Sequence, residues 1–191
     1  MKKKVLVIVA HPDDETIWMG GTLLANKDNW STTIISLCRQ KDKDRAPKFR
    51  KACEAFNAKC FMFDIDDEKL TPLDINEIIS KIKLYAGHYD YIFTHGKNGE
   101  YGHIRHKEVH KAVTKILKTR LLKAKKIFYF FYIKKNRLVY PGENSDKFIK
   151  LSDISFMGKK KLIQNVYGFT KGSFEYLCCR GIEAFKIKRN T

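Results

Sequence analysis

Two short stretches of the chain hold residues that can bind a metal ion and transfer protons. The first reads His11-Pro12-Asp13-Asp14-Glu15 and directly follows an apolar run, and the second extends from His95 to His106. A neutral imidazole and a carboxylate three residues apart can converge on one divalent cation, and an imidazole from the second stretch would complete the set. Three protein ligands that leave a fourth position open are typical of a catalytic zinc site.

The first stretch also carries more carboxylates than one metal ion needs. Placing Asp13 next to Asp14 costs electrostatic energy, and that cost is explained if one of them exchanges protons with a metal-activated water molecule. In the alternative interpretation, Asp13, Asp14 and Glu15 only stabilise the positive start of the following helix. Capping is the simpler role for Glu15, but for the two aspartates it leaves the neighbouring His11 unexplained.

The segments around these residues alternate between apolar runs and helical patterns. Short runs rich in β-branched side chains predict buried parallel strands at residues 5–10, 33–38, 60–64 and 90–95. Apolar residues at helical spacing predict helices at 20–30, at 46–57, from a start at Thr71-Pro72-Leu73-Asp74 to about Gly87 with Thr71 as the N-cap, and at 103–118. This alternation predicts a doubly wound, mostly parallel, Rossmann-like α/β sheet.

The predicted fold brings the two stretches together. In a doubly wound sheet the ligand lies beyond the carboxyl ends of the strands, where the strand order reverses. With the common order 3-2-1-4-5, the loops after the first and fourth strands are neighbours. Because these loops contain His11–Glu15 and His95–His106, we expect both sets of candidate ligands to line one crevice.

The remainder of the chain has a different character. It predicts a fifth strand at 127–133, small strands at 138–140 and 148–151, and a helix at 157–167 that Gly168 ends. Neither a linker nor a repeat interrupts the sequence. We therefore expect a single domain over residues 1–191, with an α/β core at about 1–133 and a basic C-terminal elaboration at about 134–191.

The positive charge of the chain is concentrated in its second half. The net charge is +17, from 38 Lys and Arg against 21 Asp and Glu. Residues 1–95 hold 15 of the former and 14 of the latter, and residues 96–191 hold 23 and 7. Such a surface attracts phosphates, anionic lipids or nucleic acid, although lysines on solvated faces are the simpler explanation. The basic runs lack the interleaved aromatic residues that indicate a nucleic-acid groove.

Cysteine usage and hydropathy indicate a cytoplasmic location. The five cysteines form an odd set without a C-x-x-C pair, so we expect reduced, mostly buried thiols. The longest apolar runs are far shorter than the roughly 20 residues that cross a bilayer. The basic start of the chain is followed by His-Pro-Asp-Asp-Glu and not by a cleavage site, so a signal peptide is not predicted.

The motifs resemble one family of enzymes. Val7-Ile-Val-Ala-His-Pro-Asp-Asp-Glu15, followed by Gly20-Gly21, and Gly99-Glu-Tyr-Gly-His-Ile-Arg-His106 are similar to motifs of the PIG-L/LmbE-like metal-dependent N-deacetylases. The likeness covers roughly residues 4–118, and Tyr167-Gly-Phe and Ser173-Phe-Glu175 resemble the end of some members more weakly. It implies the LmbE-like α/β fold. Members of this family remove acetyl groups from conjugates that contain N-acetylglucosamine.

The resemblance also implies roles for individual residues. His11, Asp14 and His106 match the metal ligands of the family. These ligands usually hold Zn²⁺, and another divalent ion such as Fe²⁺ is an alternative. Asp13 matches the general base that takes a proton from the attacking water.

Further residues match positions around the substrate. His103 and Tyr101 match groups that assist the tetrahedral intermediate and the leaving amine, and Arg45 matches a substrate-contacting arginine of some members. Many members carry Asp, Asn or Gln directly before the last metal histidine, where this chain has Arg105. This difference can change how His103 or His106 is oriented, so the proton donor stays open between Asp13 and His103.

Other histidines have simpler interpretations. His106 and His110 lie one turn apart, but the order H-E-x-x-H is missing, so a zinc protease is not indicated. For His110 we expect packing or a contact behind the metal ligands. For His95 we expect a hydrogen bond within its own loop.

The sequence therefore predicts a zinc-dependent hydrolase that removes the N-acetyl group from an amino-sugar conjugate. The basic second half favours an anionic or membrane-associated conjugate and is compatible with peripheral contact with an anionic membrane. The oligomeric state is not indicated. One alternative is a non-catalytic basic binding module, which the complete set of candidate site residues disfavours. The other is a hydrolase for a different bond, such as a phosphoester, but the second stretch offers only Glu100 as an acid for a second metal.

Overall fold

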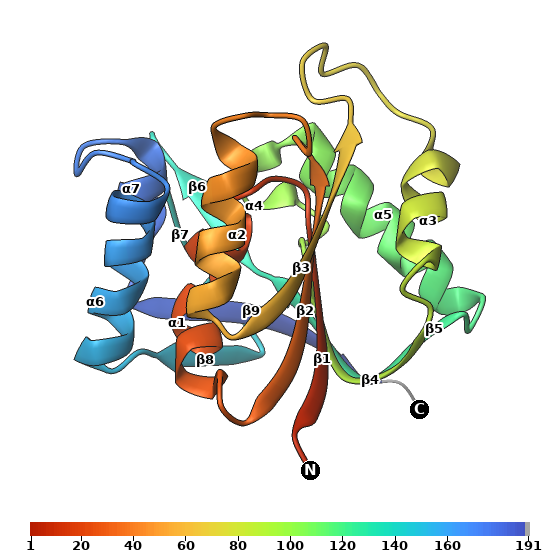
Figure 1. Cartoon of the computed structure of the whole chain (residues 1–191), viewed down its shortest axis with the longest axis horizontal. Coiled ribbons are helices and arrows are strands. Elements are labelled where there is room, and N and C mark those ends of the chain that lie inside the picture. Colours follow the sequence, from red (N-terminus) through yellow and green to blue (C-terminus); the bar gives the residue numbers. More distant parts are fainter. Residues whose placement is uncertain (190–191) are drawn as a thin grey trace.

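A seven-stranded sheet with the order β3-β2-β1-β4-β5-β9-β8 forms the centre of the protein (Figure 1). The computed structural model describes residues 1–189. The strands of this sheet are β1 (Lys3–Val9), β2 (Trp30–Cys38), β3 (Ala58–Ile65), β4 (Gly87–Thr94), β5 (Leu122–Phe130), β8 (Lys147–Lys150) and β9 (Ile182–Arg189). Strands β1 to β5 are parallel, and β9 and β8 are added antiparallel. The predicted order 3-2-1-4-5 and the doubly wound α/β class are confirmed.

Helices cover both faces of the sheet. One face carries α1 (Asp14–Asn26), α2 (Arg45–Ala55) and α6 (Asp153–Lys161), and the other carries α3 (Ile75–Lys83) and α5 (Ile104–Lys118) (Figure 1). Strand β1 lies between β2 and β4, and all its residues from Val5 to Val9 are fully buried. Burial on both faces explains why this strand is continuously apolar.

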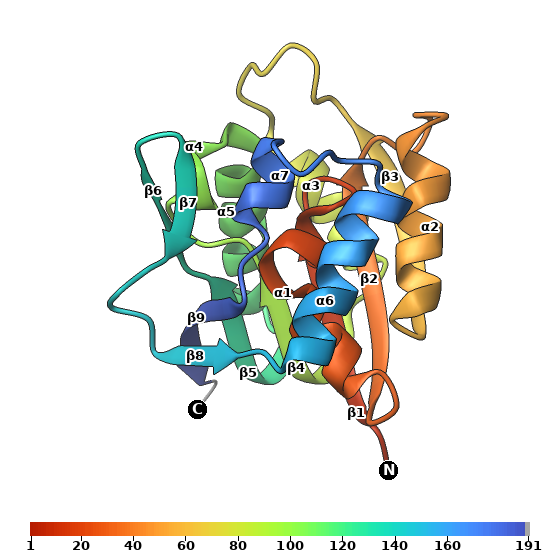
Figure 2. The ribbon, with the colours of Figure 1, turned by 90° about the vertical axis from the view of Figure 1, so that its left-hand side faces the viewer.

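The C-terminal part packs on the α1 side of the sheet (Figure 2). Helix α6 continues into a π-helix, η1 (Leu162–Val166), which is followed by α7 (Phe174–Cys178), while β6 (Tyr132–Lys135) and β7 (Leu138–Pro141) form a separate hairpin. A fully buried ion pair joins Lys159 of α6 to Glu183 of β9 at 2.8 Å. Glu183 also accepts hydrogen bonds from the backbone N–H groups of Gly21 and Thr22, so this pair ties α6 and β9 to α1.

The prediction for the first helix was wrong at both ends. Helix α1 begins at Asp14 and ends at Asn26, and Trp30 belongs to β2 instead of to the helix. The cause is the backbone of Asp13, which has a φ of 118° and turns the chain into the helix directly after the strand. Its carbonyl oxygen accepts the N–H groups of Thr16 and Ile17, which starts the helix six residues before the predicted position.

Other boundaries also differ from the predictions. The helix predicted to extend to about Gly87 ends at Lys83, and Gly87 begins β4. The fifth strand is Leu122–Phe130 and not 127–133, because residues 122 to 125 alternate between buried apolar side chains and exposed lysines. The helix predicted at 157–167 begins at Asp153, behind Ser152 as its N-cap, and Gly168 follows its π-helical end. Asp74, not Thr71, caps α3 and accepts the N–H of Asn76. No helix within residues 1–189 is long and apolar enough to cross a membrane.

Candidate metal centre and active site

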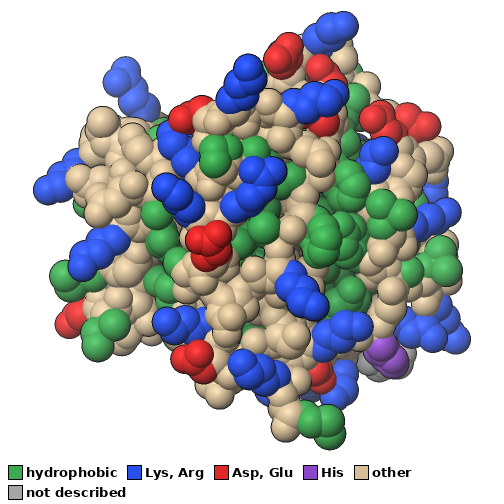
Figure 3. Space-filling view, in the orientation of Figure 1, with side chains coloured by type: hydrophobic (Ala, Val, Ile, Leu, Met, Phe, Trp, Pro, Cys, Tyr) green, Lys and Arg blue, Asp and Glu red, His purple; other side chains and the backbone are tan. Residues whose placement is uncertain are grey.

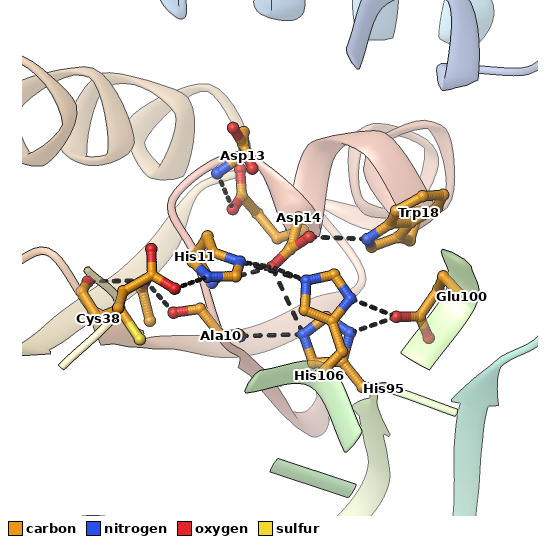
Figure 4. Close-up of polar contacts among 12 residues, drawn as sticks. Ala10, His11, Asp13, Asp14, Trp18, Cys38, His95, Glu100 and His106 are labelled. Atoms are coloured by element: carbon orange, nitrogen blue, oxygen red, sulfur yellow. Dashed lines mark hydrogen bonds and ion pairs between the residues drawn. The ribbon is translucent and has the colours of Figure 1, made fainter. Parts of the chain in front are cut away.

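The carboxyl ends of β1 and β4 meet, as predicted, and bring the two motif loops together (Figure 4). The backbone N–H of Ala10 donates to His95 Nε2 at 2.9 Å. After β4 the chain passes close to β5, where a Cβ atom on Gly96 would lie 2.2 Å from the carbonyl oxygen of Phe130. A glycine is therefore needed for the loop that leads through α4 (Gly99–Gly102) to His106 in α5.

The three predicted metal ligands converge on one point. His11 Nδ1 lies 3.2 Å from His106 Nε2 and 3.2 Å from Asp14 Oδ2, and His106 Nε2 lies 3.4 Å from Asp14 Oδ2. Ligand atoms bound tetrahedrally at zinc distances are separated by about 3.3 Å. The spacing of His11, Asp14 and His106 therefore fits a single tetrahedral ion with one open position.

The other polar atom of each candidate ligand is held by a specific partner. His11 Nε2 donates to Asp67 Oδ1 at 2.8 Å, and His106 Nδ1 donates to Glu100 Oε2 at 2.6 Å. The indole N–H of Trp18 donates to Asp14 Oδ1 at 2.8 Å. Such outer partners fix the orientation of metal ligands and the tautomer of histidines.

This arrangement leaves lone pairs facing one another. With the outer nitrogens of His11 and His106 protonated toward carboxylates, His11 Nδ1, His106 Nε2 and Asp14 Oδ2 all present lone pairs at 3.2–3.4 Å. Burial by itself lowers the pKa of both histidines, but Asp14 and their outer carboxylates outweigh it and raise each pKa. For Asp14 the directions are reversed: burial by itself raises its pKa, but the imidazoles of His106 and His95 hold this pKa well below its usual range. The cluster thus attracts a positive charge, either a proton or a metal ion.

His95 and Glu100 support the cluster from behind. Since Ala10 donates to His95 Nε2, the proton of this imidazole is on Nδ1 and is donated to Glu100 Oε2 at 2.8 Å. The predicted hydrogen bond of His95 within its loop is confirmed. Burial would raise the pKa of Glu100, but His95 and His106 hold it at about 2. His95 Nε2 is therefore already engaged, although His95, Asp14 and His106 together form a possible ligand group by distance.

Asp13 faces the same site from a strained backbone. A φ of 118° is rare for any residue other than glycine and costs on the order of 1–3 kcal/mol. The carboxylate of Asp13 accepts a hydrogen bond from Arg45 Nη1 at 2.9 Å. Burial and the neighbouring Asp14 charge raise the pKa of Asp13 well above its usual range, although Arg45 opposes this shift. A raised pKa suits a general base.

A cavity of about 160 Å³ opens beside the cluster. The predicted residues Tyr101, His103 and Arg45 line it, together with Phe174 and Glu175 at the start of α7. Burial and the nearby His106 and His11 lower the pKa of His103 to about 4, so its ring is neutral at pH 7. Within residues 1–189, the buried Nδ1 atom of His103 has no hydrogen-bond partner.

Arg105, at the position where Asp, Asn or Gln was expected from the family resemblance, does not line the cavity. Its buried guanidinium donates to the carbonyl oxygens of Asp66 and Thr71 and to Glu108 Oε2. These bonds anchor the loop after β3, and this loop supplies Asp67 to His11. Burial raises the pKa of Asp67, but His11 and Arg39 hold it at about 2.

Sequence reasoning missed Asp67 entirely. The acidic run that follows β3 was a visible signal. It pointed to no particular residue, because the spacing of the motifs does not show how a loop folds back over the sheet. The structure shows that this loop is long enough to extend past β2 to His11.

Glu15 and His110 both form hydrogen bonds inside the protein. Glu15 accepts the N–H of Asp13, which is a capping contact, but it is also fully buried and accepts hydrogen bonds from Thr16 and Tyr167. Burial raises its pKa to about 7. His110 is bonded through Nδ1 to the carbonyl oxygen of His95, which confirms a contact behind the ligands.

The fold and the site together define an α/β protein with a candidate metal centre at the carboxyl end of its sheet. The chain belongs to the PIG-L family, described as GlcNAc-PI de-N-acetylase, which matches residues 6–117. The expectation drawn from the motifs is confirmed. The chain is similar to uncharacterised protein L374 of Acanthamoeba polyphaga mimivirus: the alignment of length 176 has 28% identity, and the match covers 78% of this chain and 75% of that protein.

Solved structures with the same fold have diverse descriptions. The conserved protein TT1542 of Thermus thermophilus has a TM-score of 0.70 at 15% identity, with 96% and 94% of the two chains covered. GalB, the 4-carboxy-2-hydroxymuconate hydratase of Pseudomonas putida, has a TM-score of 0.72 at 15% identity, with 100% and 98% covered. The N,N'-diacetylchitobiose deacetylase of Pyrococcus horikoshii has a TM-score of 0.66 at 17% identity, with 98% and 84% covered. Since a hydratase shares this fold, the reaction must be argued from the site.

Proposed function

We propose that this protein is a zinc-dependent hydrolase that removes the N-acetyl group from an amino-sugar conjugate and releases acetate and a free amine. The observation that carries the proposal is the convergence of His11 Nδ1, Asp14 Oδ2 and His106 Nε2 at 3.2–3.4 Å beside the carboxylate of Asp13. Membership in a de-N-acetylase family supports the same reaction. Zn²⁺ is the ion that this donor set suits best, and Fe²⁺ is the alternative.

The three convergent atoms of His11, Asp14 and His106 would hold the ion, and His11 and Asp14 also line the cavity. A bound Zn²⁺ would polarise the acetyl carbonyl and lower the pKa of a water molecule. Asp13 accepts the proton of the attacking water, because its raised pKa makes it a better base than an ordinary aspartate. Arg45 keeps the carboxylate of Asp13 oriented through their 2.9 Å contact.

The remaining cavity residues act on the intermediate and the leaving group. Tyr101 donates to the oxyanion, and the loss of one such donor typically costs about 2.7–4 kcal/mol. His103, which lines the cavity and is neutral at pH 7, hydrogen-bonds the departing amine, which receives its proton from Asp13. Arg45 also contacts the substrate at the rim of the cavity.

The size of the cavity indicates how much of the conjugate the site can enclose. Its volume of about 160 Å³ suits one acetamido sugar ring more than an extended oligomer. The anionic character of the conjugate and peripheral membrane contact stay predictions from the basic second half, and a cytoplasmic location stays a prediction from cysteine usage and hydropathy. A salt titration tests the first, since attraction between exposed charges weakens at high ionic strength. A Michaelis constant that is equal at low and high salt would count against an anionic substrate.

The direct experiment is a panel of N-acetylglucosamine conjugates incubated with the Zn²⁺-loaded and the Fe²⁺-loaded protein. We expect primary amine and acetate to appear in equal amounts from at least one conjugate. An Asp44→Asn variant, which changes an exposed acid before α2, serves as a control that retains activity. Failure of every conjugate with both ions would contradict the proposal.

A further inference from the structure

The segment Tyr167-Gly168-Phe169 follows η1 and has no role in the function proposed above. Gly168 has a φ of 83°, a left-handed conformation that glycine adopts without strain. The resulting turn allows both Tyr167 and Phe169 to pack on the core cluster of the α1 side, with ring centroids 6.4 Å apart. Both aromatic residues contact partners of Asp13, which lies more than 150 positions earlier in the chain.

Tyr167 acts on the backbone of Asp13 through Glu15. The Tyr167 hydroxyl donates to Glu15 Oε1 at 2.7 Å, and Glu15 Oε2 accepts the N–H of Asp13 at 3.1 Å. Tyr167 and Glu15 are both buried. The peptide of Asp13 is strained, so it needs neighbours that hold it in place. The Glu15 carboxylate provides such a contact, and Tyr167 fixes the orientation of that carboxylate.

Phe169 acts on the side chain of Asp13 through Arg45. The guanidinium of Arg45 lies over the Phe169 ring, 4.6 Å from its centroid, and Arg45 Nη1 donates to Asp13 Oδ2 at 2.9 Å. A planar guanidinium stacked on a ring loses little freedom when it forms a further hydrogen bond. Phe169 therefore holds the arginine in the orientation that meets Asp13.

We propose that Tyr167 and Phe169 are positioning residues for Asp13, one for its backbone and the other for its carboxylate. The C-terminal segment thereby completes a site whose candidate metal ligands and base lie between residues 11 and 106. The role of Asp13 as a base rests on the function proposed above, whereas the two relays of contacts are independent of it.

The kinetic test uses the Zn²⁺-loaded full chain. Tyr167→Phe removes one hydroxyl and should lower kcat about tenfold, with KM and zinc content unchanged, as is typical when an outer contact of a reacting group is lost. Phe169→Leu should lower kcat and also raise KM severalfold, because Arg45 contacts substrate. Tyr140→Phe, which removes an exposed hydroxyl of β7, is the matched control and should change neither constant.

A double-mutant cycle tests the relay itself. If Tyr167 acts through Glu15, adding Tyr167→Phe to Glu15→Gln should cause no further loss of kcat. Independent, multiplicative losses would overturn the relay. A role in folding alone would lower the melting temperature and leave kcat per folded molecule unchanged, which would also overturn it.

A second readout does not depend on activity. In Tyr167→Phe, hydrogen exchange of the Asp13 amide should accelerate about tenfold, while the amide of Val7 in β1 exchanges at the wild-type rate. Unchanged protection of Asp13 would overturn the proposal even in an active enzyme. Faster exchange at Asp13 in a protein that releases no amine would support the positioning role and contradict only the proposed function.

Discussion

The two ends of the sheet differ in how their charges are held. At the carboxyl end, Asp14, Glu100 and His106 are buried, and each contacts at least two other polar groups. At the amino end, exposed basic side chains surround an open cavity of about 550 Å³, and they are Lys118, Arg120, Lys123, Lys125 and Lys188. On the face seen in Figure 3, Lys and Arg side chains are likewise scattered among other residues.

The comparison shows that net charge does not locate the chemistry of this protein. The +17 charge is carried largely by side chains that remain in water, where their interactions are screened. The candidate site instead consists of few charges, each desolvated and each paired. The predictions below test this difference, beginning with the change that should have the largest effect.

Asp13→Asn should cause the largest change within a folded protein. The variant keeps the shape of the side chain but cannot accept a proton, so kcat should fall roughly 10²- to 10⁴-fold. Amine release by the zinc-loaded variant measures this effect, and metal analysis should find the same zinc content as in the wild type. Full turnover would show that Asp13 is not the base.

Lys159→Met should cause the largest loss of stability. The variant leaves Glu183 buried without its cation, which typically costs about 3–5 kcal/mol. Urea unfolding measures the difference, and Lys161→Met, an exposed lysine of the same helix, is the control. If both variants unfold at the same urea concentration, the buried pair contributes no more to stability than an exposed lysine does.

Asp67→Ala should weaken metal binding without abolishing it. Loss of the partner of His11 Nε2 is expected to lower zinc affinity about 10- to 100-fold. Competition with a chelator measures this affinity. Asp64→Asn, an acid near the end of β3 that pairs with Lys41, should bind zinc like the wild type. If the Asp67 variant binds zinc as tightly as the wild type, Asp67 does not support the metal site.

Asp90→Asn should have the smallest effect, because it breaks an exposed pair at the basic end. The hydrogen bonds from Lys125 and from the Lys4 backbone lower the pKa of Asp90. A lowered pKa stabilises the fold above the ordinary value of 3.8, and this contribution is lost as the pH falls through the folded value. Denaturant unfolding should therefore show a small difference at pH 7 that disappears in stronger acid.

Salt provides the control for the Asp90 variant. The difference at pH 7 should shrink in high salt, because the ion pair with Lys125 is exposed. Asp28→Asn, in the turn before β2, should not differ from the wild type at either pH. A large loss of stability that persists in acid would contradict the prediction, because it would show that Asp90 contributes more to the fold than an exposed ion pair does.

Periodic patterns predicted the frame of the molecule well. The four apolar runs predicted the first four parallel strands, and the common strand order of this fold class placed His11 and His106 in one crevice. The start of α1 was missed because it depends on the left-handed backbone of Asp13, which hydrophobic spacing does not encode. Asp67 was missed because its position depends on Arg105, which anchors a long loop by side-chain hydrogen bonds.

Long-range contacts of the C-terminal part were also outside the reach of sequence patterns. The antiparallel insertion of β9 beside β5 and its pair Glu183–Lys159 join segments far apart in the chain. The domain boundaries remain a prediction, and the roles of individual site residues are predictions that the experiments above address.

A zinc titration of the metal-stripped protein tests the central claim most directly. If one cation held by His11, Asp14 and His106 performs the chemistry, amine release should be absent at the start, rise in proportion to added zinc and stop rising at one equivalent per chain. His106→Ala should show no such rise. Undiminished turnover by the stripped protein, or by the His106 variant, would contradict the account.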